Sequence, residues 1–261
     1  MTEALVLSRV IDGVATVTIN RPAAQNSFDA ATGEAFIATV ERAGADPAVR
    51  VVTIAANGPS FSAGGDFNWV LTWPGQTPAE NKRGALMMMR VVQCVYDLPK
   101  PTIARVQGAA VGGGIGVMLA CDYAIASDKA RFGLTSARNG LLAGIAIPVL
   151  IQTLGARKAR QLLIHGGIFD AAEALRIGMV DRVVDVDALD AEVATLAGEL
   201  KRGAPTVQAL VKRLVTQIDA APNDAAMVEL IATNVAEQCL TPDAREGMSA
   251  FLEKRKPGWL G

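Results

Sequence analysis

A glycine-rich stretch near the middle of the chain joins a strand-like run to a helix-like run. Gly108–Gly114, with the sequence GAAVGGG, lies between the apolar runs Ile103–Val106 and Ile115–Ala120. The first amides of a helix have no partner within the helix, and the helix dipole is positive there. Glycine also lets a ligand approach the main chain closely. The stretch therefore predicts either a binding site for a negative oxygen or close packing of a helix on a sheet.

A second glycine-bearing loop favours the anion site. Phe61–Phe67, with the sequence FSAGGDF, follows the strand-like run Val51–Ala55. Bare amides at two strand ends could together hold one developing oxyanion. The common nucleotide-binding patterns do not fit, because G-x-x-x-x-G-K-[ST] is absent and G-x-G-x-x-G counted from Gly112 fails at Val117.

The composition is that of a globular protein. The chain has 261 residues, of which 51% are hydrophobic and 20% charged, with a net charge of −1. This length suffices for one large domain, or a domain with an appendage, and a sizeable core. The sequence contains no block of Lys and Arg of the kind that binds nucleic acid. It also contains no apolar run of the kind that forms a signal peptide or a membrane span. We therefore expect a cytoplasmic protein.

Few residues are available for metal binding or nucleophilic catalysis. Cys94, Cys121 and Cys239 are widely spaced and are predicted to be reduced, packed thiols. His165 is the only histidine, so His and Cys cannot build a metal site. It stands before two glycines at a helix-like end, which favours a capping role over that of the base in a Ser-His-Asp hydrolase.

Strand-like and helix-like segments alternate up to residue 187, and only helices are predicted after it. A hairpin is predicted around Asp12-Gly13, and a capping box at Thr77–Glu80 begins a helix that ends near Asp97. This pattern predicts a mostly parallel α/β core over 1–187 and a helical extension over 188–261. The other predicted segments are a helix from Ser27 or Asp29 to near Gly44, strands Arg50–Ala55, Asp122–Ser127, Arg131–Leu134 and Met179–Val184, a helix Ile145–Leu154, a helix from Asp170 to Gly178, and tail helices 188–201, 205–218, 224–239 and 242–255.

The whole chain resembles the crotonase (enoyl-CoA hydratase/isomerase) superfamily. The order and spacing of the matching pieces carry the resemblance, since each piece alone is only modestly specific. They are NRP at Asn20–Pro22 with Asn26, FSAGGD at Phe61–Asp66, GAAVGGG at Gly108–Gly114, ACD at Ala120–Asp122, ARFGL at Ala130–Leu134, EALRIGMV at Glu173–Val180, and REGMSAFLEKRK at Arg245–Lys256.

The resemblance implies a spiral of β-β-α units with a helical tail that builds trimers, often paired into hexamers. It also implies that a coenzyme A thioester is bound as the substrate and that its enolate is stabilised. The two oxyanion N–H donors fall on Gly65 and Gly113, and the Ala63 carbonyl would meet the adenine amino group. Phe251 and Lys254 match tail residues that reach a neighbouring subunit's coenzyme A, the lysine near its 3′-phosphate. The remaining coenzyme contacts would be Ala23, Ala24, Gln25, Gly64, Asp66, Phe67 and Gly112.

The positions of the family's usual acid/base carboxylates carry other residues. Hydratases commonly have a glutamate three residues after the central oxyanion glycine, where this chain has Gly116, and a second where it has Ser136. Another branch, the isomerases of ring-modified phenylacetyl-CoA, keeps an aspartate where Gly144 stands. The local sequence looks most like the methylglutaconyl-CoA hydratase branch, which tolerates glycine at the first site but keeps the second glutamate. A serine hydroxyl is no useful base near pH 7 without a partner.

Two interpretations remain open. The first is a lyase or isomerase, most simply a hydratase-type enzyme for an unusual acyl group, with Ser136 and a water, Asp66 or Arg138 as acid/base. Asp66 is also interpreted as a loop cap, and Arg138 either as a partner for an acyl carboxylate or as a solvated loop residue. The second is an acyl-CoA-binding protein without catalysis. Both predict a homotrimer or a dimer of trimers, with no metal, nucleic acid or membrane partner.

Overall fold

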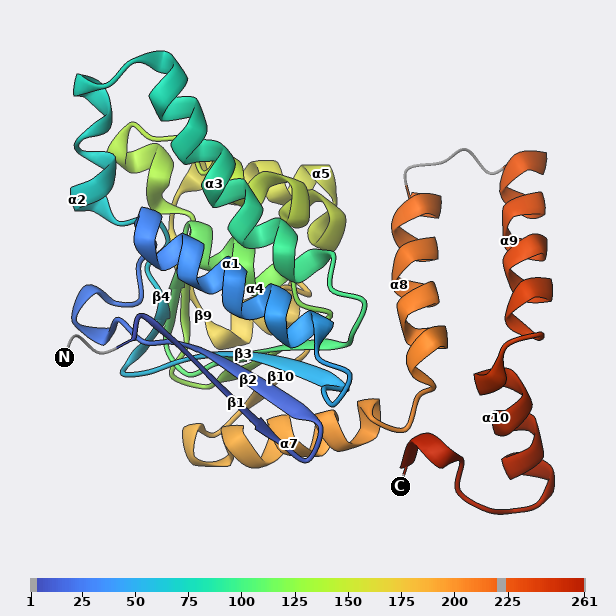
Figure 1. The fold of residues 1–261 in the computed structure, drawn as a ribbon. Helices are drawn as coiled ribbons and strands as arrows, with labels where there is room; N and C mark the ends of the chain where they lie inside the picture. Colours follow the sequence, from blue (N-terminus) through green and yellow to red (C-terminus); the bar gives the residue numbers. More distant parts are fainter. Residues whose placement is uncertain (1–3, 220–223, 261) are drawn as a thin grey trace.

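A six-stranded, mostly parallel sheet lies at the centre of the protein, seen in a computed structural model that describes residues 4–219 and 224–260 (Figure 1). The hairpin of β1 (Val6–Ile11) and β2 (Val14–Ile19) turns at Asp12 and Gly13, both in the left-handed region, and confirms the predicted hairpin. All later strands pair in parallel, in the order β1-β2-β3-β5-β7-β10. These strands are β3 (Val51–Ala56), β5 (Thr102–Val106), β7 (Tyr123–Ser127) and β10 (Arg182–Val184).

A second sheet of four very short strands carries the loops of the candidate site. Of these strands the sequence predicted only β8, within the segment Arg131–Leu134. The other strands were not predicted, because runs of three residues show no period. The order is β4-β6-β8-β9, with β4, β6 and β8 parallel and β9 antiparallel. The strands are β4 (Ser60–Ser62), β6 (Ala109–Val111), β8 (Arg131–Gly133) and β9 (Ile168–Asp170).

Several helices cover one face of the large sheet and form the main core. Asp29 caps α1 (Ala30–Ala45) by accepting a hydrogen bond from the Thr32 amide at 2.8 Å. The predicted capping box of Thr77 and Glu80 begins α3 and is confirmed. The helices before residue 177 are α1, α2 (Phe67–Val70), α3 (Pro78–Tyr96), α4 (Gly113–Leu119), α5 (Ile147–His165) and α6 (Ala171–Arg176). Short 3-10 turns lie at Pro22–Ala24, Trp73–Gly75, Thr135–Asn139, Gly144–Ala146, Val186–Ala188 and Gly258–Leu260.

Two helices depart from the sequence prediction. Helix α2 lies in a stretch for which the sequence predicted neither a helix nor a strand, and it begins at the Asp66 cap rather than at a periodic apolar pattern. Helix α5 runs beyond the predicted end at Leu154, through a kink at Gly155 with φ 74°, and ends at His165. Gly166 follows in the left-handed conformation, so His165 occupies the last turn as predicted.

The tail begins on the opposite face of the large sheet. There, α7 (Leu189–Leu200) packs Leu189, Val193 and Leu196 against Val51 and Ile103 of the sheet. The next three helices stand beside the core, with a gap between their ribbons and those of α3 and α5 (Figure 1). They are α8 (Pro205–Asp219), α9 (Ala225–Gln238) and α10 (Pro242–Leu252), and they confirm the predicted helical tail. None of the helices in the described ranges is long and apolar enough to cross a membrane.

Candidate functional site

The two glycine-bearing loops lie against each other. Strands β4 and β6 are parallel neighbours, with Ser60 opposite Ala109, so the chain leaves both strands at the same edge of the small sheet. A methyl group built on Gly64, which has φ +83°, would lie 2.7 Å from the Gly113 amide nitrogen. A methyl group on Gly113 would lie 3.8 Å from the Gly65 amide nitrogen. The structure therefore brings together the two positions predicted to supply oxyanion donors.

The glycines at this junction serve two different purposes. At Gly64 and Gly114 an added methyl group would overlap the facing backbone. It would lie 2.7 Å from the Gly113 amide nitrogen in the case of Gly64, and 2.4 Å from the Ser62 carbonyl oxygen in the case of Gly114. At Gly65 and Gly113 the nearest atoms would be 3.5 Å away or further, which is ordinary van der Waals contact. Close packing thus explains the first pair, whereas the second pair could carry a methyl group without a clash.

The amides of Gly65 and Gly113 have no acceptor among the residues that the structure describes. Their neighbours are engaged, because the Gly64 amide donates to the Ser62 hydroxyl at 3.1 Å and the Gly112 amide donates to the Gly133 carbonyl at 2.8 Å. Gly65 and Gly113 both line one cavity of about 500 Å³. Two unpaired N–H donors beside a cavity can stabilise an oxygen that gains negative charge during a reaction.

The cavity has mostly apolar walls. Trp69 and Trp73 form one wall, with ring centroids 5.3 Å apart in an edge-to-face arrangement. Met88 and Met89 of α3 form another, and a third comes from the segment 139–145. The sequence analysis did not indicate the two tryptophans as wall residues, because their stretch shows no period that could reveal them.

None of the lining residues, all within the described ranges, carries an ionisable side chain. The polar side chains apart from the indoles are those of Thr135, Ser136 and Asn139. A methyl group on Gly112 would lie 3.9 Å from the Ser136 hydroxyl oxygen, so this hydroxyl faces the start of α4. Ser136 is therefore beside the unpaired amides, but no base in the cavity wall is available to activate it.

The two other positions at which the family resemblance implies a carboxylate differ in their surroundings. Gly116 is buried inside α4, and a methyl group on it would lie 3.1 Å from the Val92 side chain and 3.5 Å from the Ala146 Cα. It does not line the cavity. Gly144 does line the cavity, where its nearest neighbour is the Leu142 side chain. A side chain at residue 116 would thus require the Val92 side chain to shift.

Asp66 serves the fold. It is 5% exposed, accepts a hydrogen bond from the Asn68 amide at 2.8 Å, and pairs with Arg21 at 2.7 Å. Burial alone would raise the pKa of Asp66, but the hydrogen bonds from Arg21, Asn68 and Trp69 outweigh it, so this pKa is lowered. Asp66 therefore remains an ionised cap of α2, and its side chain does not line the cavity.

Arg138 also serves the fold. Its Nε donates to the His165 carbonyl oxygen at 3.3 Å, at the C-terminal end of α5, and it does not line the cavity. Neither Asp66 nor Arg138, the two residues that the sequence offered as an acid/base, thus lines the cavity.

The predicted coenzyme contacts fall into two separate regions. The Ala63 amide donates to the Gln25 carbonyl at 2.9 Å, which joins the stretch Ala23–Gln25 to the loop after β4. Ala63, Phe67 and Gly112 line the cavity. Phe251 and Lys254 instead lie at the end of α10, far from α2 and α3 (Figure 1), and Phe251 is 82% exposed. Within one chain these two residues do not meet the cavity.

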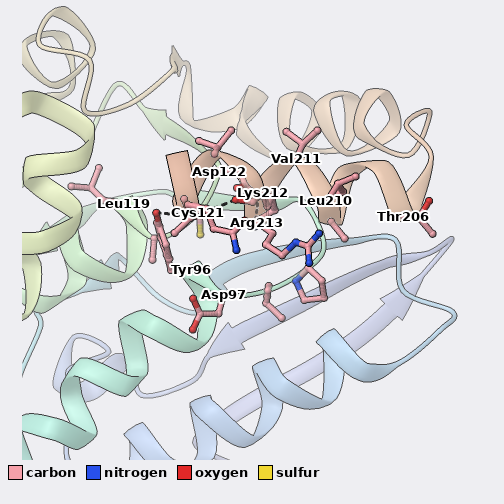
Figure 2. Close-up of a pocket in the computed structure, with 17 residues that line it drawn as sticks. Tyr96, Asp97, Leu119, Cys121, Asp122, Thr206, Leu210, Val211, Lys212 and Arg213 are labelled. Carbon is pink, nitrogen blue, oxygen red and sulfur yellow. Dashed lines mark hydrogen bonds and ion pairs between the residues drawn. The ribbon is translucent and has the colours of Figure 1, made fainter. Parts of the chain in front are cut away.

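A larger cavity, of about 940 Å³, lies between the core and α8 (Figure 2). Lys212 of α8 pairs with Asp122 at 2.7 Å and also donates to the Lys100 carbonyl, while Arg213 donates to Asn234 at 2.9 Å. Because these cations are already engaged, the cavity offers no ready anion site.

The cysteines offer no second reactive centre in the core. Burial raises the pKa of Cys94 to about 12 and raises that of Cys121 as well, so both remain packed thiols. Cys239 was also predicted to be packed, but it is exposed at the end of α9. Across the described ranges, His, Cys, Asp and Glu form no group of three suited to a metal ion.

Comparison with known proteins gives consistent matches along the whole chain. Residues 9–261 match the family described as Enoyl-CoA hydratase/isomerase. A Thermus thermophilus protein, provisionally named an enoyl-CoA hydratase, is 34% identical over 94% of this chain and 96% of its own. The trans-2-decenoyl-[acyl-carrier-protein] isomerase of Streptococcus mutans is 30% identical over 98% of both chains. The crystal structure of an enoyl-CoA hydratase from Shewanella pealeana has a TM-score of 0.94 and 29% identity, over 98% of this chain and 96% of that one.

Proposed function

Because the chain belongs to the enoyl-CoA hydratase/isomerase family, we propose that it binds an acyl-coenzyme A thioester and stabilises the thioester enolate. The carbonyl oxygen of the thioester would accept hydrogen bonds from the amides of Gly65 and Gly113. The observation that carries this proposal is the pair of unpaired amides beside one mostly apolar cavity. Each such donor typically contributes a factor of about 10²–10³ in rate, because its bond strengthens as the oxygen becomes negative.

We propose a hydratase-type lyase as the activity, with an isomerase as its close variant. Both names occur among the relatives, and both reactions pass through a stabilised enolate. The proton would move between the substrate and a water held by the Ser136 hydroxyl. A positioned acid/base usually contributes about 10²–10⁴ in rate, so a cavity without a carboxylate should support slow turnover.

The alternative is an acyl-CoA-binding member of the family with weak or lost hydratase activity. The absence of any ionisable side chain from the cavity wall, which is formed by described residues, favours this alternative. Both versions keep the coenzyme site, so binding alone cannot distinguish them.

Turnover of a panel of enoyl-CoA thioesters, measured beside their affinities, tests the proposal. We expect affinity for the thioesters together with slow but measurable hydration, seen as loss of the enoyl absorbance. Binding without turnover across the panel would favour the alternative. Absence of binding to every thioester and to free coenzyme A would contradict both.

We also propose a homotrimer or a dimer of trimers. Within one chain, Asn234 and Ala250 are the only buried residues of the described parts of α8, α9 and α10. The exposed apolar side chains of these helices form a surface that a single copy leaves uncovered. They include Val211, Val215, Val228, Val235, Met248, Phe251 and Leu252. In such an assembly Phe251 and Lys254 would reach the coenzyme of a neighbouring copy.

Light scattering of the purified protein at micromolar concentration should therefore give the mass of a trimer or a hexamer. Burial of the apolar tail surface between copies is the reason for this expectation. A monomeric mass would contradict it, and would also leave the coenzyme role of Phe251 and Lys254 without a structural basis.

A further inference from the structure

The walls of the cavity beside Gly65 and Gly113 limit the charge of the group that can bind there. Its walls include the indoles of Trp69 and Trp73 and the side chain of Met88, which is 3% exposed. A methyl group on Gly84 of α3 would lie 2.9 Å from the Trp73 ring and 3.3 Å from the Trp69 ring. The two rings thus lie directly on the α3 backbone and form a continuous apolar wall.

No Lys or Arg is among the described residues that line the cavity. The cations of α3, which are Lys82, Arg83 and Arg90, are exposed, and two further cations are engaged elsewhere. Arg21 pairs with Asp29 at 3.1 Å and with Asp66 at 2.7 Å. Arg138 is held at the end of α5 by the His165 carbonyl. The polar groups that remain in the wall are hydroxyls and one amide, which can orient a ligand but carry no charge.

A carboxylate that entered this cavity would lose its hydration and gain no cation in return. That loss is severe for an ion, whereas an alkyl group of the same shape gains by leaving water. We propose that the acyl group of the substrate is uncharged and apolar, which excludes acyl groups that end in a second carboxylate. This inference rests on the proposed function and specifies its substrate class. The inferred substrate class differs from the substrate of the methylglutaconyl-CoA hydratase branch, although the local sequence looks most like that branch.

Two saturated thioesters of matched shape test the charge directly. Glutaryl-CoA ends in a carboxylate, and 5-methylhexanoyl-CoA carries an isopropyl group in its place. Calorimetric titration of the intact protein should give at least about 100-fold weaker binding for glutaryl-CoA. Because both ligands lack the reactive double bond, the result does not depend on turnover.

The outcomes separate this inference from the proposed function. Equal or tighter binding of glutaryl-CoA would overturn the inference and leave the acyl-CoA function intact. Failure of both thioesters and of free coenzyme A to bind would remove the function, and the inference with it.

A matched pair of variants tests the cause of the exclusion. Met89 lines the cavity and is half-buried, so Met89→Lys can place an ammonium group there, and Met89→Gln is a neutral control of similar length. The lysine variant should bind glutaryl-CoA at least about tenfold more tightly than the glutamine variant. Equal binding by two folded variants would show that charge is not what excludes the carboxylate, and would overturn the inference.

Discussion

Replacement of Gly113 by proline is expected to lower any turnover of an enoyl-CoA thioester by about 10²–10³-fold. Proline has no N–H, so the substitution removes one of the two unpaired amides that border the cavity. Gly113 is the first residue of α4, the position at which a helix tolerates proline best. The variant should therefore fold and still bind the thioester, which circular dichroism and calorimetry would check before turnover is measured.

Gly113→Ala is the matched control, because it adds a side chain and keeps the N–H. Its methyl group would lie 3.5 Å from the Gly64 Cα and 3.7 Å from the Met88 methyl carbon, which are ordinary contacts. The alanine variant should keep most of its turnover while the proline variant loses nearly all of it. Native turnover in a folded proline variant would show that the Gly113 amide is not an oxyanion donor.

The parts of the fold that the sequence predicted are those that local chemistry encodes. The turn at Asp12-Gly13 and the capping box of Thr77 and Glu80 each lie within a few residues, and both form as predicted. The amphipathic tail helices show the same local control. The small sheet was not predicted, because its three-residue strands are defined by partners distant in sequence, such as Ser62 opposite Ala110.

The candidate site likewise has features that the sequence predicted and features that it could not. The sequence indicated two glycine loops that could meet at one anion, and the structure brings Gly65 and Gly113 to one cavity. The sequence could not show that Asp66, beside Gly65, pairs with Arg21 and caps α2. Nor could it show that the neighbourhood of Gly116 is filled by side chains from other elements. A missing side chain in an alignment therefore need not leave space in the fold.

Ser136→Glu is expected to raise hydration of crotonyl-CoA, by up to about 10²–10⁴-fold if the carboxylate is well positioned. The Ser136 hydroxyl faces the start of α4, 3.9 Å from where a methyl group on Gly112 would lie, so a longer acidic side chain can reach the substrate beside the oxyanion donors. Partial burial in the apolar cavity raises the pKa of a carboxyl group towards neutrality, where it can both accept and return a proton. Steady-state hydration rates of the native and variant proteins measure the gain.

Two further variants decide what a gain would mean. Ser136→Gln matches the size of glutamate without its proton chemistry, and it lacks the hydroxyl proposed to hold the water, so it should give no gain over the native rate. Gly116→Glu, at the other position where the family resemblance implies a glutamate, should lower the melting temperature and give no gain, because Val92 and Ala146 crowd that position. If Ser136→Glu folds, binds the thioester and hydrates no faster, the 135–139 turn does not face the reacting carbon. If the native protein already hydrates crotonyl-CoA as fast as carboxylate-bearing relatives, an acid/base must reach the cavity from outside its own wall, and the tail of a neighbouring copy is the place to seek it.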